Sequence, residues 1–145
     1  MPINMDYSNI LENTTREISR SESDDKYKLC AAELNNAVIG FCRFFHTNGL
    51  PEHKKIYQSP IGWYGRGIMV AQPYRRQRIA QFLFNHRVQM LREMGVKEFY
   101  SIVDKNNLTS MKMHQKFGYV EVERGPGFLQ FSFEGSEGCL FKLII

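Results

Sequence analysis

The sequence predicts an α/β domain, and three observations lead to that prediction. The chain has 145 residues, of which 43% are hydrophobic, and this suits one globular domain over residues 1–145 with an ordinary core. Strand-like and helical hydrophobic patterns alternate in the order helix, three strands, helix, strand, helix, two strands. The sequence contains no internal repeat and no low-complexity tract. We therefore expect one mixed sheet with helices packed against it.

The first elements are a helix and a hairpin. Apolar residues at helical spacing predict an early helix that ends near Arg20, before a polar break over 21–25. The segments 27–34 and 38–46 have the composition of strands. Asn35-Asn36 between them can adopt the left-handed geometry of a two-residue turn. We expect an antiparallel hairpin.

The three cysteines have no metal-ligand spacing, so we expect no metal site. With a two-residue turn, Cys30 lies opposite Phe41, and Cys42 then points to the other face of the hairpin. A disulfide between Cys30 and Cys42 is therefore not expected. Buried free thiols in a reducing compartment fit better.

A long polar loop over 48–60 leads to a strand over 62–71. Within that strand Gly65-Arg66-Gly67 are poor strand formers, which indicates a bulge or a close backbone approach. The main helix is expected from about Tyr74 to Met94, because Ile79, Leu83, Phe84, Val88 and Leu91 recur along one face, and Gly95 is a stop signal. The remaining elements are a strand over 98–103, a helix over 108–117 closed by Gly118, and strands over 119–123 and 139–145 joined by a glycine-rich connection.

The junction between the strand and the main helix carries three arginines in four residues, Arg75, Arg76 and Arg78. The first amides of a helix have no partner inside the helix, and the helix dipole adds partial positive charge there. Guanidinium groups match the geometry of phosphate oxygens. The junction is therefore expected to bind an anion.

Two motifs in this region and downstream of it resemble those of a known superfamily. The first is Arg75-x-x-Arg78-x-Ala80, and the second is Asn107-x-x-Ser110-x-x-Met113-His114-x-Lys116-x-Gly118-Tyr119. Together, and in this order, they are similar to the pyrophosphate loop and the following helix of the GNAT superfamily of acetyl-CoA-dependent N-acetyltransferases. The resemblance covers residues 26 to 145, which is most of the chain.

The resemblance implies a fold as well. It predicts a GNAT-like α/β fold with a central mixed, mostly antiparallel sheet flanked by helices, and a V-shaped split between the central strands. Family members usually begin with a strand and a further helix that this sequence lacks. Either the early segment substitutes for them, or another subunit supplies that edge. A homodimer would cover the bare edge.

The resemblance further implies that acetyl-CoA is the cofactor. Backbone groups of one strand segment would pair with the pantetheine arm, as a strand pairs with a sheet edge. The alternative for this segment is an ordinary core strand. The amides of the loop would hold the pyrophosphate, and the alternative there is a solvated basic helix start. The strand segment is Ile68, Met69 and Val70, and the loop residues are Arg75, Arg76, Gln77, Arg78, Ile79 and Ala80.

Arg78 stands where the family prefers glycine. A left-handed backbone there would cost a non-glycine residue about 1–2 kcal/mol. We expect helical dihedrals instead, which would carry little penalty and would let the guanidinium add a phosphate contact.

Three residues of the second motif receive roles from the resemblance. Asn107 would reach the cofactor while capping the helix, although capping alone also explains it. Ser110 is small enough to admit the ligand. His114 replaces the tyrosine taken to protonate the leaving thiolate of coenzyme A, and a histidine can serve because it titrates near neutral pH. A packing role for His114 is the alternative.

No general base is assigned. The central strand carries no Glu or Asp between Gly62 and Ala71. Tyr64, His46 and ordered water remain open. The aromatic residues Tyr57, Trp63, Tyr64, Phe128 and Phe131 would line the acceptor pocket or belong to the core.

Charge and hydropathy restrict the remaining functions. The net charge of +4 and the pI of about 9.0 fit a polyanionic ligand. No run reaches the ~20 apolar residues that span a bilayer, and no signal pattern opens the chain, so we expect a cytoplasmic protein without a membrane partner. The leading interpretation is an N-acetyltransferase that acts on the amine of a small molecule or peptide.

Two other interpretations remain. One is a coenzyme A-binding module without acyl transfer. The other is a nucleic-acid binder, whose affinity would fall steeply with salt. The arginines are concentrated at one helix start, and the chain has no recognised nucleic-acid motif, so no nucleic-acid partner is expected.

Overall fold

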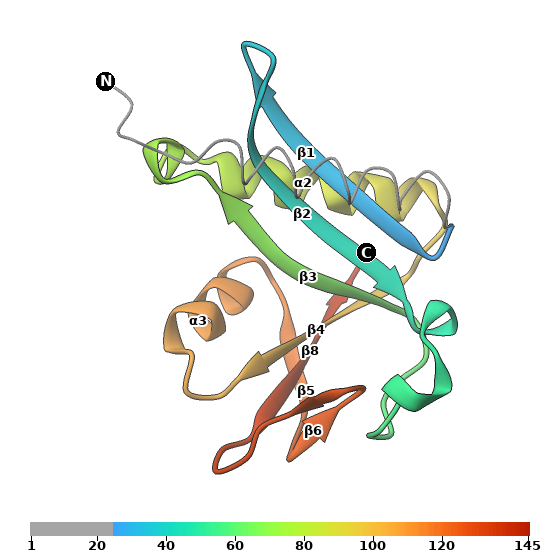
Figure 1. Cartoon of the computed structure of the whole chain (residues 1–145). Coiled ribbons are helices and arrows are strands. Elements are labelled where there is room, and N and C mark those ends of the chain that lie inside the picture. Colours follow the sequence, from blue (N-terminus) through green and yellow to red (C-terminus); the bar gives the residue numbers. More distant parts are fainter. Residues whose placement is uncertain (1–24) are drawn as a thin grey trace. The chain divides into compact units, whose positions relative to one another are not determined.

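The computed structural model describes residues 25–145, so the predicted helix ending near Arg20 lies outside the described residues (Figure 1). The architecture is α/β, as predicted, with a mixed six-stranded sheet and two helices, α2 (Ile79–Glu93) and α3 (Leu108–Lys116). The chain forms two compact units, one from the residues up to Phe45 together with Arg66–Gly95, and one from His46–Gly65 with Val96–Ile145. In sheet order the strands are β1 (Tyr27–Leu34), β2 (Ala37–His46), β3 (Trp63–Val70), β4 (Glu98–Asp104), β8 (Gly138–Ile144) and β5 (Val120–Gly125).

The hairpin of β1 and β2 in the first unit has the predicted turn but a different register. Asn35 and Asn36 have φ values of 52° and 64°, which confirms the left-handed turn. Between the pairs Glu33↔Val38 and Ala32↔Gly40, Ile39 is left without a partner, so the ladder contains a bulge. From that point every pair is shifted by one residue.

The shifted register corrects the prediction for the cysteines. Cys30 lies directly opposite Cys42, not opposite Phe41, and both thiols therefore share one face. That face packs against α2, because Cys30 Sγ lies 3.0 Å from Met90 Sδ, and Cys42 Sγ lies 3.9 Å from the Leu83 carbonyl. All three cysteines are buried free thiols. The hydrogen bond to Cys42 and burial raise the pKa of the Cys30 thiol, which keeps it protonated.

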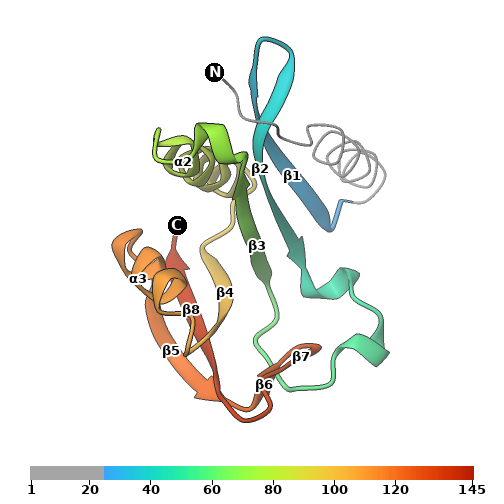
Figure 2. The ribbon, with the colours of Figure 1, turned by 60° about the vertical axis from the view of Figure 1, so that its left-hand side comes forward.

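Helix α2 begins at Ile79, five residues later than predicted. Gln72–Tyr74 form a short 3-10 turn, and the next residues break the helical path before α2 starts. Figure 2 shows α2 along one face of the β1–β2 hairpin. Leu83, Phe84 and Leu91 are buried there as predicted, and the stop signal at Gly95 is confirmed by its φ of 78°.

The end of β3 is held by the bulged segment of β2. The Ala71 amide donates to the Ile39 carbonyl at 2.8 Å. Gly40 is required beside this bond, because a Cβ there would lie 2.9 Å from the Met69 carbonyl oxygen. The close approach predicted in β3 is wrong for Gly67, where a Cβ would meet no described atom within 4 Å.

The second unit is built on β4, β8 and β5, which pair antiparallel, with α3 against β4 (Figure 2). The start of β3 pairs with β4 in parallel over two residue pairs, Trp63 with Phe99 and Tyr64 with Tyr100. The core of the second unit contains the fully buried Phe99, Leu140 and Phe141. The predicted split between the central strands stays a prediction.

The loop regions of the second unit contain short elements that the hydrophobic pattern did not predict. The polar loop holds the 3-10 turns η1 (Thr47–Gly49) and η2 (Glu52–Lys54). The glycine-rich connection forms a small hairpin of β6 (Gly127–Phe128) and β7 (Phe131–Ser132). Two residues per strand are too few to show a period.

In residues 25–145 no helix is long and apolar enough to cross a membrane, and no cluster of side chains could hold a metal.

Candidate functional site

The loop between β3 and α2 has an unusual backbone. Arg75 is extended, with φ −69° and ψ 152°, whereas Arg76 and Arg78 have φ values of 63° and 64°. Both left-handed residues are exposed arginines. Left-handed residues in a tight turn redirect successive amides, and such turns occur in anion-binding nests.

The amides of this loop are open to a ligand. The helical hydrogen bonds of α2 begin with the Phe82 amide, which donates to the Arg78 carbonyl at 3.0 Å, and no side chain caps the helix. The first turn also contains no acidic residue. Within residues 25–145, no protein acceptor receives the amides of Arg76, Gln77, Arg78, Ile79 and Ala80.

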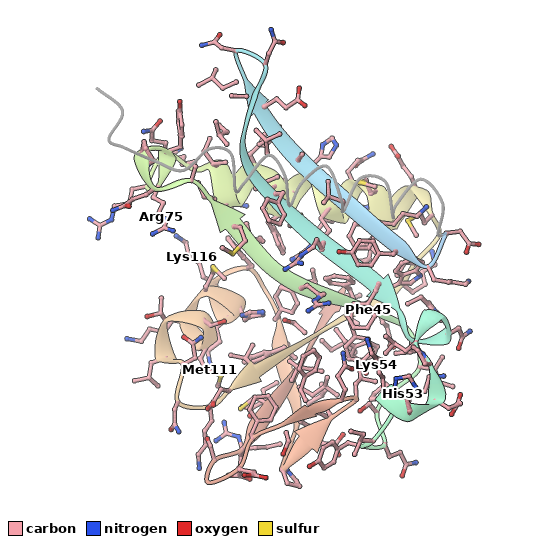
Figure 3. All side chains as sticks on the ribbon, in the orientation of Figure 1. Phe45, His53, Lys54, Arg75, Met111 and Lys116 are labelled. Atoms are coloured by element: carbon pink, nitrogen blue, oxygen red, sulfur yellow. The ribbon has the colours of Figure 1, made fainter. Side chains whose placement is uncertain are left out.

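Arg75 differs from the other predicted loop residues. Its amide donates to the Gln72 carbonyl at 3.2 Å, so the open amides begin at Arg76 and not at Arg75 as predicted. Its Nε donates to the Val70 carbonyl at 3.0 Å, which ties the loop to the end of β3. Figure 3 shows Arg75 on this loop. Arg75 therefore shapes the loop, and the open donors come from its successors.

The backbone conformation of Arg78 differs from the prediction. Its dihedrals are left-handed, φ 64° and ψ 19°, and not helical. This is the conformation that glycine adopts without steric cost, and an arginine there pays about 1–2 kcal/mol. The side chain of this strained residue is exposed, so its guanidinium can turn toward an anion at the helix start.

The strand residues predicted to face the cofactor are not core residues. Met69 is 50% exposed, and Ile68 and Val70 are half-buried. A buried core strand, which was the alternative for this segment, does not describe them. Their backbone lies at the end of β3, next to the loop that carries the open amides.

In the second unit, Asn107 caps α3. Its Oδ1 accepts the Ser110 amide at 3.2 Å, as the capping prediction requires. The preceding residue is fixed in a similar way, because the Asn106 amide donates to Asp104 Oδ1 at 2.8 Å. The start of α3 is therefore capped by a side chain of the protein itself. Figure 3 shows Met111 and Lys116 on this helix.

His114 lies in the last turn of α3 and is half-buried. Its Nδ1 is 2.7 Å from the Ser110 carbonyl oxygen and 3.4 Å from Ser110 Oγ, and its Nε2 is 2.8 Å from Ser101 Oγ. The ring also stacks on Phe141 at 5.2 Å and meets the edge of Tyr119 at 4.8 Å. The imidazole is thus fixed in position and orientation.

Ser101 is a neighbour of His114 that sequence reasoning missed. It lies on β4, in an otherwise apolar run from Phe99 to Val103, and its side chain points toward α3. A lone polar residue in such a run is the signal that could have drawn attention to it, because buried polar groups need partners.

The residues considered as a general base have partners of their own. The Tyr64 hydroxyl donates to the Pro60 carbonyl at 2.7 Å, and burial raises the pKa of Tyr64 further above its ordinary value. Tyr64 is therefore a poor base near neutral pH. His46 Nδ1 accepts the Asn48 amide at 3.0 Å.

The predicted aromatic residues divide into two groups. Tyr64 and Phe128 are almost fully buried and belong to the core. Trp63, Tyr57 and Phe131 are half-buried. Tyr57 also joins its loop to the small β6–β7 hairpin, since its amide donates to the Leu129 carbonyl at 2.9 Å.

Comparison with known proteins identifies a family and a fold. A model described as the acetyltransferase (GNAT) family matches residues 3–119, a range that includes both motifs. No curated protein matches the chain in sequence.

Solved N-acetyltransferases share the fold at low sequence identity. The ribosomal-protein-alanine N-acetyltransferase of Brucella melitensis superposes with a TM-score of 0.65 and 17% identity over 93% of this chain and 78% of that one. The ribosomal-protein-S18-alanine N-acetyltransferase of Escherichia coli gives 0.62 and 15%, over 88% and 75%. Arabidopsis thaliana NAA60, in complex with a bisubstrate analogue, gives 0.63 and 20%, over 100% and 96%.

Proposed function

We propose, because the chain belongs to the acetyltransferase (GNAT) family, that it transfers an acetyl group from acetyl-CoA to the primary amine of a small molecule or peptide. The amine would attack the thioester directly. A tetrahedral oxyanion would form, and backbone amides of β3 would stabilise it, a type of contribution commonly worth about 3–4 kcal/mol.

The observation that carries the proposal is the set of open amides after β3. A pyrophosphate needs several donors at once, and the loop offers five successive amides without a protein acceptor in residues 25–145. The exposed guanidinium groups of Arg76 and Arg78 add charge at the same place. The absence of an acidic residue in the first turn of α2 removes a competitor for these donors.

In the second unit, His114 is the group proposed to protonate the departing thiolate. It is the titratable side chain at the family's acid position, and its ring is held by hydrogen bonds and aromatic contacts. Asn107 and Ser110 would face the cofactor from the first turn of α3. The side-chain oxygen Oδ1 of Asn107 is engaged in the cap, so the side-chain nitrogen Nδ2 is the atom proposed to make that contact.

The acceptor is proposed to be a primary amine. Two of the structural neighbours are named as enzymes that acetylate an alanine of ribosomal proteins. Peptides with a free amino terminus therefore belong in any substrate panel, together with small primary amines.

The test is thiol release from acetyl-CoA during incubation with that panel. Steady production of free coenzyme A that depends on the amine, with the acetylated amine found by mass spectrometry, is the expected result. Saturable binding of acetyl-CoA without turnover on any amine would count against the enzymatic function.

That second outcome would identify a coenzyme A-binding module, and one observation favours this alternative. Both ring nitrogens of His114 have protein partners, which is compatible with a purely structural histidine. Calorimetry separates the two functions. A module binds coenzyme A and acetyl-CoA alike and leaves the thioester intact, whereas an enzyme consumes it when an amine is present.

A further inference from the structure

His114 is held at both nitrogens by groups of the second unit, and the chemistry of those groups determines where its protons lie. Nδ1 is 2.7 Å from the carbonyl oxygen of Ser110. A carbonyl oxygen carries no proton and can only accept, so Nδ1 must be the donor. In the neutral ring, Nε2 then has the lone pair.

The partner of that lone pair is the hydroxyl of Ser101, 2.8 Å away. A neutral Nε2 can only accept, so the Ser101 hydroxyl donates its proton to the ring. When the ring is protonated, the direction reverses, and Nε2–H donates to Ser101 Oγ. The serine keeps its proton, and its O–H is then free to donate to another acceptor. The contact between Ser101 and His114 can therefore carry a proton in either direction.

This geometry affects how His114 could protonate a thiolate. A direct transfer from Nε2 would require the ring to give up its 2.8 Å bond to Ser101 Oγ. The ring is also restrained by Phe141 and Tyr119, at 5.2 and 4.8 Å. A transfer through the hydroxyl needs no movement of the ring.

We infer that Ser101 is a catalytic residue that relays the proton of His114 Nε2, while the Ser110 carbonyl holds the neutral ring as the Nδ1–H tautomer. The inference rests on the proposed function. In the step, the thiolate of coenzyme A takes the hydroxyl proton of Ser101, and Ser101 Oγ takes the proton of His114 Nε2. The charged ring becomes neutral, the thiolate becomes a thiol, and Ser101 ends with one proton as it began.

The test compares Ser101→Ala with Ser101→Thr in the full chain. Because general acid catalysis contributes about 10²–10⁴-fold, loss of the relay with His114 retained should lower kcat about ten-fold and leave KM for acetyl-CoA nearly unchanged. Ser101→Thr keeps the hydroxyl and should recover most of the loss. A purely structural serine would not give this division between kcat and KM.

A second readout determines how many protons move in the transition state. The dependence of kcat on the fraction of deuterium oxide should be curved for the wild type, because two protons move together. It should be linear for Ser101→Ala, where one proton moves. Wild-type kcat and a wild-type curve in Ser101→Ala would overturn the relay.

A third readout does not depend on activity. Nitrogen-15 spectra of the histidine side chains, with the His114 signals assigned from a His114→Asn variant, report which ring nitrogen carries the proton. Protonated Nδ1 in the neutral ring is expected, and protonated Nε2 would overturn the inference even in an active enzyme. Protonated Nδ1 without turnover on any amine would instead overturn the proposed function and, with it, the relay.

Discussion

The N-termini of α2 and α3 are opposite solutions to the same requirement. Both helices leave amides without partners inside the helix. At α3, Asn107 Oδ1 takes the Ser110 amide, so the protein satisfies its own donor. At α2 no side chain caps the helix, and two left-handed arginines precede it. The comparison teaches that a helix start can be closed for stability or kept open for an anion, and the neighbouring side chains decide which.

The two helices are also expected to affect different quantities: α2 the affinity for acetyl-CoA, and α3 the rate of the chemical step. The start of α2 should contribute to binding of acetyl-CoA, because its donors match a phosphate group. His114 in the last turn of α3 should contribute to the chemical step. Four substitutions test this difference between the two helices.

The largest effect is expected from His114→Asn. The substitution removes a titratable ring and should lower kcat about 100-fold, in the range for loss of a general acid. Calorimetry should find the Kd for acetyl-CoA almost unchanged. His86→Asn is the matched control, because His86 is an exposed histidine on α2 that stacks on Phe82. A kcat close to the wild type in His114→Asn would remove α3 from the chemistry.

The next effect is expected from Arg78→Ala. Loss of a guanidinium beside the pyrophosphate should raise the Kd for coenzyme A about ten-fold, which corresponds to about 1.4 kcal/mol. The difference in Kd between the wild type and Arg78→Ala should become smaller as salt is added. Binding of pantetheine, which lacks the pyrophosphate, should not change. Arg92→Ala removes the same charge at the other end of α2 and is the control. Equal losses in both variants would show a general charge effect and no site.

Asn107→Ala should reduce stability by about 1 kcal/mol, because an N-cap side chain is lost. Asn107→Asp keeps an acceptor for the Ser110 amide and should retain most of the stability. Urea denaturation measures both variants. A loss of similar size in Asn107→Asp would mean that the cap is not the source of the stability.

The smallest effect is expected from comparing Arg78→Gly with Arg78→Ala. Both remove the guanidinium, but only glycine accepts φ 64° without strain. Relief of about 1–2 kcal/mol of strain is offset by the greater freedom of glycine in the unfolded chain, about 0.5–1 kcal/mol. The glycine variant should therefore be more stable by about 0.5–1 kcal/mol in urea denaturation. A glycine variant that is less stable than the alanine variant by about 0.5–1 kcal/mol would show that the left-handed conformation carries no cost.

Most elements could be predicted from local patterns. The hairpin turn at Asn35-Asn36, the buried face of α2 and the cap at Asn107 all follow from rules that involve only nearby residues. The β6–β7 hairpin could not be predicted, because its strands are too short to show a period.

The errors arose where contacts distant in sequence decide the geometry. The bulge at Ile39 moved Cys42 opposite Cys30, and the Ile39 carbonyl is bound by Ala71 from another strand. The buried Arg87 donates to the Arg66 carbonyl at 3.3 Å, a partner that helical periodicity does not reveal. Local propensity had no information on either contact.

The α/β class, the family motifs and the arginine-rich junction before the main helix all follow from the sequence alone, because they depend on hydrophobic period and residue type. Only the tertiary structure decided that Arg78 is left-handed and that His114 meets Ser101. Backbone strain and pairing between a strand and a helix depend on where the rest of the chain holds each residue. A single residue's chemistry cannot specify that position, whereas a packed core can.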